Sequence, residues 1–186
     1  MKKTLYNYKR EIEKLPIKEK YTKEELLKED FLIDKENNIE IYYAPHNEYI
    51  NPKAKILIVG ITPGFIQMNT AISTARKELE NYNDIEDIQY KCKVSGRFSG
   101  SLRKNIISML DEIKLNELDD FEDILLIPLG KSVEEVLCKL KEEKFIKENQ
   151  ILMGFPHPSG ANVNRLVQLE ENKKSMIDII KKTVSS

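Results

Sequence analysis

The chain has 186 residues, a length that predicts one domain with its own hydrophobic core. Hydrophobic residues make up 40% and charged residues 33% of it, which indicates a globular protein and excludes an intrinsically disordered one. The formal net charge of −1 excludes an indiscriminate polybasic binder, although a local basic segment can still bind nucleic acid.

No apolar run approaches the roughly 20 residues that span a bilayer, and no apolar stretch typical of a secretory signal follows the basic N-terminus. We therefore expect a cytoplasmic protein. The two cysteines, Cys92 and Cys138, lie far apart in the sequence, so they cannot supply four thiolates to a metal ion or an iron–sulfur cluster. We expect both to be reduced thiols, with Cys138 in a helix core.

The N-terminal third is rich in helix signals. The pattern predicts a helix over 4–14, and Thr22 with Glu25 forms a capping box for a short helix that runs to residue 29. A strand is predicted over 39–43. We expect residues 1–38 to be a helical segment that packs on the core, and residues 39–186 to form an α/β domain.

The rest of the chain alternates strands with helices. Almost continuously apolar runs at 55–59 and 124–130 are typical of parallel strands buried on both faces, and 151–155 is predicted as a further strand. Helices are predicted over 70–82, over 101–113, from a cap at Ser132 through 140, and over 164–182. This order predicts the α/β class, as a three-layer α/β/α sandwich with a mainly parallel central sheet.

Two short loops follow predicted strands, Gly60–Gly64 after the first apolar run and His157–Asn162 after the last. Ligands of open α/β sheets bind at the carboxyl ends of the strands, so loops far apart in sequence can meet over one crevice. The first offers backbone and a hydroxyl, and the second offers an imidazole and a helix N-terminus. Together they suit an anionic, phosphate-bearing ligand and a leaving group that needs a hydrogen-bond donor.

His157 is the best candidate for a catalytic side chain. Pro156 and Pro158 stiffen the backbone around it, while Ser159 and Gly160 permit close approach of a phosphate. The other histidine, His46, lacks such a setting and is expected to be structural.

Several other candidates each have a plainer interpretation. Gly60–Gly64 also fits an ordinary connection, and Thr62 could orient a water molecule, cap a helix or fill a turn. Residues 91–104 contain no acidic residue, and Phe98 within them could stack on a base or belong to the core. Asn162 and Arg165 could contact DNA or only cap the last helix.

Four segments together resemble the uracil-DNA glycosylase superfamily. Gly60–Gly64 is similar to its Gly-(Ile/Met)-Asn-Pro-Gly motif, and His157–Gly160 resembles its His-Pro-Ser motif. Ser95–Gly100 is similar to the glycine-rich segment with the base-stacking Phe, and Ile127–Ser132 resembles a later strand with its Leu-Gly turn. The four occur in the family's order, and the resemblance runs over residues 39–180.

The resemblance implies a base-excision repair hydrolase that flips a damaged base out of DNA and hydrolyses its N-glycosidic bond. His157 would donate a hydrogen bond to the departing base, Phe98 would stack on it, and the backbone at Ile61 would hold its edge. The residues implied to contact the DNA backbone or to lie in the DNA-penetrating loop are Pro63, Gly64, Ser159, Gly160, Asn162 and Arg165. Gly60, Phe65 and Arg97 complete the implied substrate-binding set. The implied protein is a monomer that acts on single- or double-stranded DNA without a metal or organic cofactor.

The chain departs from the family at two places. Thr62 stands where active relatives carry an Asp or Asn that positions water, and a hydroxyl is a weaker orienter. The family also has a strand bearing a base-reading Asn, whereas residues 114–123 leave little room for one, and Asn105 and Asn116 lie in other contexts. Two rival functions stay open: a weak or inactive glycosylase relative that binds DNA, and an enzyme acting on nucleotides or nucleosides.

Overall fold

The computed structural model describes residues 4–81, 84–98, 100–115 and 123–183. The chain divides into two compact units, each made of two segments, and each unit is described by itself. Unit 1 comprises Met1–Asn51 and Pro63–Phe98, and unit 2 comprises Pro52–Thr62 and Ser99–Ser186. The expected division of the chain at residue 38 stays a prediction.

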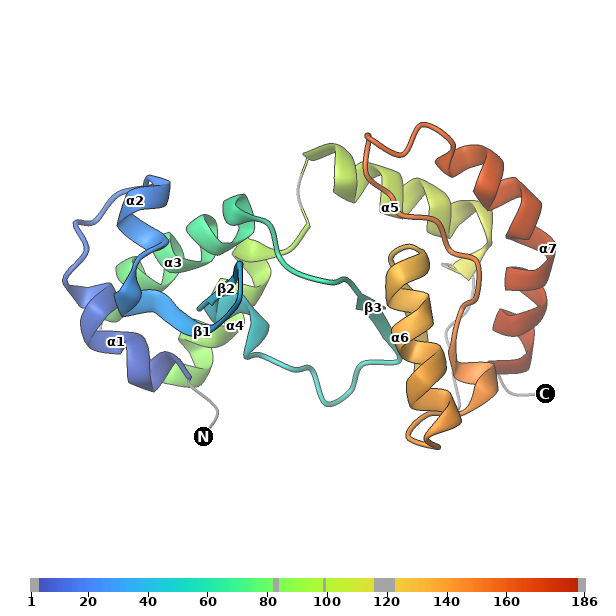
Figure 1. The fold of residues 1–186 in the computed structure, drawn as a ribbon, viewed down its shortest axis with the longest axis horizontal. Helices are drawn as coiled ribbons and strands as arrows, with labels where there is room; N and C mark the ends of the chain where they lie inside the picture. The colour runs from blue at the N-terminus through green and yellow to red at the C-terminus, as the bar shows by residue number, and fades with distance from the viewer. Residues whose placement is uncertain (1–3, 82–83, 99, 116–122, 184–186) are drawn as a thin grey trace. The chain divides into compact units, whose positions relative to one another are not determined.

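Unit 1 is mainly helical (Figure 1). It contains α1 (Leu5–Glu13), α2 (Lys23–Leu26), α3 (Phe65–Glu80) and α4 (Ile85–Gly96), with short 3₁₀ turns at Glu29–Phe31 and Pro45–Asn47. The predicted helix over 4–14 is confirmed, and so is the capping box at Thr22, although α2 ends at Leu26. The helix predicted over 70–82 begins earlier, at Phe65, and Gly64 is its N-cap residue. No apolar periodicity strong enough to predict a helix marks α4 in the sequence.

A two-stranded hairpin completes unit 1. β1 (Leu32–Glu36) pairs antiparallel with β2 (Ile39–Tyr42), so the strand predicted at 39–43 belongs to a local hairpin. Asn37, with a φ of 52°, makes the tight turn between them. The rings of Tyr8 and Tyr43 stack in the core with centroids 4.0 Å apart.

Unit 2 contains the parallel strands. β3 (Ile56–Val59) pairs with β4 (Leu125–Pro128), with Ile56 opposite Leu125 and Val59 opposite Pro128. Both predicted strands and their parallel pairing are thus confirmed. β4 is buried along its length, as predicted, whereas no residue of β3 is fully buried and Leu57 is 46% exposed, so the expected burial of this run on both faces is wrong. The structure is therefore of the mixed α/β class, with a small parallel sheet.

The third predicted strand, 151–155, is reduced to one parallel bridge between Ile151 and Leu126. The prediction of a strand is wrong because the backbone turns at once. The Met153 N–H donates to the Ile151 carbonyl, and Gly154 adopts a φ of +80° that an extended strand does not contain.

Unit 2 also contains helices α5 (Gly100–Glu112), α6 (Lys131–Glu142) and α7 (Arg165–Thr183) (Figure 1), and α6 contacts β4. Val133 and Leu137 of α6 form one apolar cluster with Leu126 and Ile151. Val136, although apolar and on the same helix, is 57% exposed. The N-cap of α6 is Gly130 rather than Ser132, because the Gly130 carbonyl accepts the first helical hydrogen bonds.

Two further observations concern the whole described chain. No helix within it is both long enough and apolar enough to cross a membrane. Cys92 and Cys138 are both free thiols, but Cys92 is the buried one and Cys138 is only half-buried. Most of the stretch 114–123, in which the sequence left little room for a further strand, lies outside the described residues.

Candidate functional site

The carboxyl ends of β3 and β4 lie side by side in unit 2. The Leu129 N–H donates to the Val59 carbonyl at 2.8 Å, which extends the ladder one residue beyond the strands. A Cβ atom on Gly60 would lie 3.9 Å from Cδ1 of Leu129, an ordinary van der Waals contact. The loop that starts at Gly60 therefore leaves the sheet next to the Leu129–Gly130 turn.

The same turn supports His157. A Cβ atom on Gly130 would lie only 3.1 Å from the Cβ atom and 3.6 Å from Cδ2 of His157. Gly130 also has φ of 90° and ψ of 169°, a conformation that is essentially restricted to glycine. We call Gly60, Leu129, Gly130 and His157 the strand-end cluster. As predicted, the two loops that follow β3 and Phe155 converge on one end of the sheet.

The protonation of the His157 ring is set by its own loop. The imidazole is exposed, and its Nδ1 atom accepts a hydrogen bond from the Ser159 N–H at 3.2 Å. A nitrogen that accepts carries no proton, so the neutral ring bears its proton on Nε2. His157 can therefore present an N–H donor to a ligand while it remains uncharged.

Side-chain amides hold the backbone of this loop. Nδ2 of Asn105, on α5, donates to the Pro158 carbonyl at 2.7 Å, and Nδ2 of Asn162 donates to the His157 carbonyl at 3.1 Å. The Asn162 amide also donates to Oε1 of Gln168, and Arg165 Nη1 donates to the Asn162 carbonyl. In this structure both predicted DNA-contacting side chains, Asn162 and Arg165, make hydrogen bonds within their own loop and helix.

Most of the remaining predicted residues of unit 2 are exposed, and Ser159 is half-buried. Ile61 is 75% exposed, and Thr62 is exposed and makes no side-chain hydrogen bond within the described part of the chain. The Ser159 hydroxyl accepts a hydrogen bond from the Ala161 N–H at 3.2 Å. A Cβ atom on Gly160 would have no atom within 4 Å. The strand-end cluster is thus bordered mostly by exposed residues.

In unit 1, Gln67 links two other predicted segments. Its Oε1 accepts from the Gly64 N–H at 3.0 Å, and its Nε2 donates to the Gly96 carbonyl at 3.1 Å. Gly64 is the N-cap of α3, and Gly96 is the last residue of α4. The end of the first motif and the start of the Arg97–Phe98 segment are therefore joined through one amide side chain.

His46 packs against Gly96, the last residue of α4. The imidazole is 4% exposed, and a Cβ atom on Gly96 would lie 2.9 Å from its Cγ atom. Its Nδ1 atom has no hydrogen-bond partner among the described residues. Burial, with a smaller contribution from the charge of Lys93, lowers the pKa of His46 to about 4. These contacts agree with the expected structural role of His46.

The other predicted residues of unit 1 differ in exposure. Arg97 is exposed, whereas Pro63 and Phe98 are half-buried. Phe65, the first residue of α3, packs against the apolar core of this unit. In this structure Phe65 therefore contributes to packing and is not placed for contact with a ligand.

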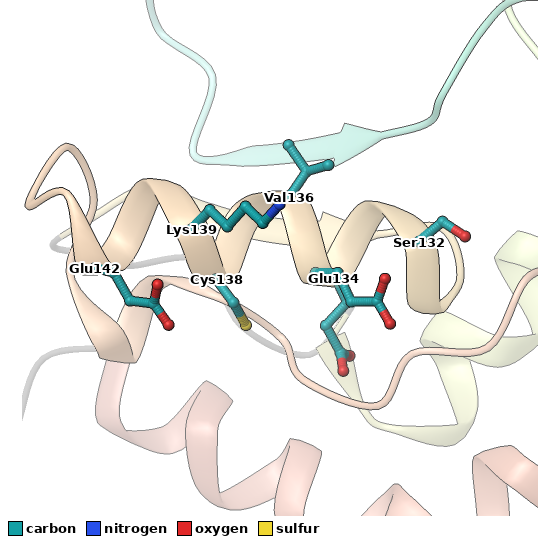
Figure 2. Close-up of a pocket in the computed structure, with 7 residues that line it drawn as sticks. Ser132, Glu134, Val136, Cys138, Lys139 and Glu142 are labelled. Carbon is teal, nitrogen blue, oxygen red and sulfur yellow. The ribbon is translucent and has the colours of Figure 1, made fainter.

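A pocket of about 390 Å³ lies elsewhere, along α6 in unit 2. Figure 2 shows that its lining comes from this single helix, with Glu134, Cys138, Lys139 and Glu142 among the side chains. The Glu134 carboxylate is already used, because it accepts a hydrogen bond from the Gly154 N–H. None of the residues predicted for the site lines this pocket. In the described ranges, no three His, Cys, Asp or Glu side chains gather closely enough to hold a metal ion.

Three positions near the predicted loops, two amides and one glycine, are not apparent from the sequence as parts of the site. Asn105 and Gln67 sit inside helices, where an amide side chain gives no sequence signal of its distant partner. Gly130 was noticed only as part of a turn, although a glycine between a buried strand and a helix is a recognisable sign of a close approach.

Comparison with known proteins gives one significant similarity. The chain is 32% identical over 215 residues to the uncharacterized protein YoxB of Bacillus subtilis (strain 168), covering 83% of this chain and 84% of YoxB. No model of a known protein family matches the chain, and no solved structure matches it significantly. At that identity and coverage, the chain belongs to the same family as YoxB.

Proposed function

We propose that the chain is a DNA glycosylase that hydrolyses the N-glycosidic bond of uracil or a related damaged base, built on an α/β sandwich like that of the uracil-DNA glycosylase superfamily. The observation that carries the proposal is the His157 ring at the carboxyl ends of two parallel strands, with its Nδ1 atom accepting a hydrogen bond from the Ser159 N–H so that Nε2 is left for a ligand. Hydrolysis of this bond needs such a donor, because negative charge develops on the base as it leaves.

His157 would act as an electrostatic catalyst. Its Nε2–H would donate to the oxygen of the base on which the charge develops, and the ring would not have to lose a proton first. The packing against Gly130 keeps the ring in one place, so the donor is oriented before the substrate binds. The backbone at the exposed residue Ile61 would face the base edge, and the backbone at Ser159 and Gly160 would face the phosphates.

The attacking water would be held by Thr62. A hydroxyl can accept a hydrogen bond from water, but it is a far weaker base than a carboxylate, so we expect slow excision. This residue also gives the alternative its support: a protein with the same fold that binds DNA and excises little or nothing. Stacking on the base by Phe98 and contact with DNA by Arg97, Pro63 and Gly64 stay predictions from the resemblance alone.

The test is excision on labelled single- and double-stranded oligonucleotides that carry uracil, hypoxanthine or xanthine, with alkaline cleavage of abasic sites as the readout. Replacing His157 by Ala should reduce the rate by about 10²- to 10³-fold, the usual effect of removing one such donor. His157→Gln, which retains an N–H donor, should keep more activity than His157→Ala. Ser108→Ala, an exposed change on α5 outside the candidate site, serves as the control.

Two further measurements separate the proposal from its alternative. Thr62→Asn should raise the excision rate if the fold is a competent glycosylase limited at that position. If no variant excises any base but DNA binding weakens steeply with rising salt, the DNA-binding alternative is correct. If neither excision nor DNA binding is observed, the proposal is wrong.

A further inference from the structure

We propose that Asn105 is a positioning residue for His157, which it controls through a single peptide group. Asn105 lies on α5 and donates to the Pro158 carbonyl at 2.7 Å, across 53 positions of sequence. It does not contact the imidazole. Its effect on the ring passes through the peptide that joins Pro158 to Ser159.

That peptide carries both relevant groups. The Pro158 carbonyl and the Ser159 N–H belong to one planar unit, and in a trans peptide they point in opposite directions. No cis peptide bond is present in the described residues. Asn105 holds the carbonyl on one side, so the N–H on the other side is directed to Nδ1 of His157, 3.2 Å away. A rotated peptide would withdraw this N–H from the ring.

The loop has few other means of fixing this peptide. Pro156 and Pro158 lack an N–H, and in the described chain no other donor reaches the Pro158 carbonyl. Asn162 holds the preceding carbonyl, that of His157, whose peptide has no N–H because Pro158 supplies its nitrogen. Asn162 can thus steady the loop, but it does not orient the donor to Nδ1.

Asn105 lies on a helix that is packed into the core. Its neighbours on α5, Ile106 and Met109, are 4% and 1% exposed, so the helix is anchored in the core of unit 2. A side chain on a packed helix holds a geometry better than one on a loop. The inference rests on the proposed function in one respect: the Nε2–H that Asn105 preserves is the donor offered to the departing base.

The test needs no substrate. When His157 is protonated, its Nδ1 atom can no longer accept, so the amide resonance of Ser159 should shift as the His157 ring titrates. We expect this coupling in the two-dimensional ¹H–¹⁵N spectrum of the wild type and its loss in Asn105→Leu, which has a similar shape but no donor. Ser108→Ala, on the same helix and exposed, is the matched control and should keep the coupling.

Asn105→Asp serves as a second variant should Asn105→Leu not fold, because an ionised carboxylate also lacks the donor. Retention of the Ser159 coupling in a folded Asn105 variant would overturn the inference, and so would its absence from the wild type. Excision is measured alongside, with an expected fall in kcat of roughly tenfold or more and a smaller change in KM. If the wild type excises no base but the coupling depends on Asn105, the proposed function fails and the positioning role stands. If excision and the coupling both survive in Asn105→Leu, only the positioning role fails.

Discussion

The two histidines of this chain occupy opposite environments, one in each unit. His46 is buried against Gly96, and its Nδ1 atom has no partner among the described residues. His157 is exposed, rests on Gly130, and has its Nδ1 atom occupied by the Ser159 N–H. The first arrangement favours a neutral ring by excluding water, whereas the second fixes the ring but leaves one nitrogen free for a ligand.

The contrast separates stability from chemistry. A buried imidazole without a partner must stay neutral for the unit to remain folded, so its effect is on stability and depends on pH. An exposed imidazole with a fixed tautomer has little folding energy to lose, so its effect should fall on ligand binding and catalysis. Each of the following changes tests one side of this difference.

The largest expected effect is acid destabilisation through His46. Its pKa is about 4 in the folded protein and close to 6.5 when unfolded, so the unfolded state binds the proton more readily. The stability contributed by the neutral ring is complete above the unfolded pKa and is lost as the pH falls toward the folded one. The loss amounts to about 3 kcal/mol between pH 6.5 and 4, measured as the free energy of unfolding in denaturant.

The control for this prediction is His46→Gln, which removes the titrating group and keeps a polar side chain. The carboxylates contribute equally in both proteins, so the difference between the two pH profiles isolates the histidine. Parallel profiles from pH 6.5 to 4 would show that His46 is not held neutral by burial.

The next effect concerns the support beneath His157. Gly130→Ala should destabilise the protein by about 2 kcal/mol, because alanine is strained at this backbone conformation and its methyl group meets His157. Thermal and denaturant unfolding measure this change. Gly60→Ala is the matched control, since its Cβ atom would make an ordinary contact at 3.9 Å. Equal stability of the two variants would contradict the close packing of Gly130 on His157.

Much of unit 2 could be predicted from the sequence because its signals are local and strong. The apolar runs of β3 and β4, and the apolar spacing of α5 with its buried Ile106 and Met109, correspond to elements of the structure. The prediction of a strand at 151–155 is wrong because composition does not reveal the turn that follows Ile151. What ends it is the positive φ of Gly154, together with the hydrogen bond from its N–H to Glu134, a partner 20 residues away.

The candidate site also contains residues that could be predicted from the sequence and residues that could not. His157 and Ser159 could be recognised from the sequence because the residues of the His-Pro-Ser-Gly loop are consecutive. The partners that orient this loop were not, since Asn105 acts from 53 positions away. In unit 1, the amide of Gln67 joins Gly64 to Gly96 across 29 positions. Long-range hydrogen bonds from helix amides leave no periodic pattern, and a single sequence cannot reveal them.

The smallest effect on stability is expected at Gly160. The same residue gives the most selective test of the proposed contact with DNA phosphates. Its backbone does not adopt a positive φ, and a Cβ atom would meet nothing within 4 Å, so the free protein has no need of glycine here. Gly160→Ala should therefore change the free energy of unfolding by no more than about 0.5 kcal/mol. If a phosphate approaches this backbone, the added methyl group should weaken DNA binding by about tenfold, or about 1.4 kcal/mol. Unfolding in denaturant and DNA titration at fixed salt measure the two quantities on the same preparation. Unchanged DNA affinity would remove Gly160 from the binding face, whereas weaker binding at full stability would mean that this glycine is required by a ligand and not by the fold.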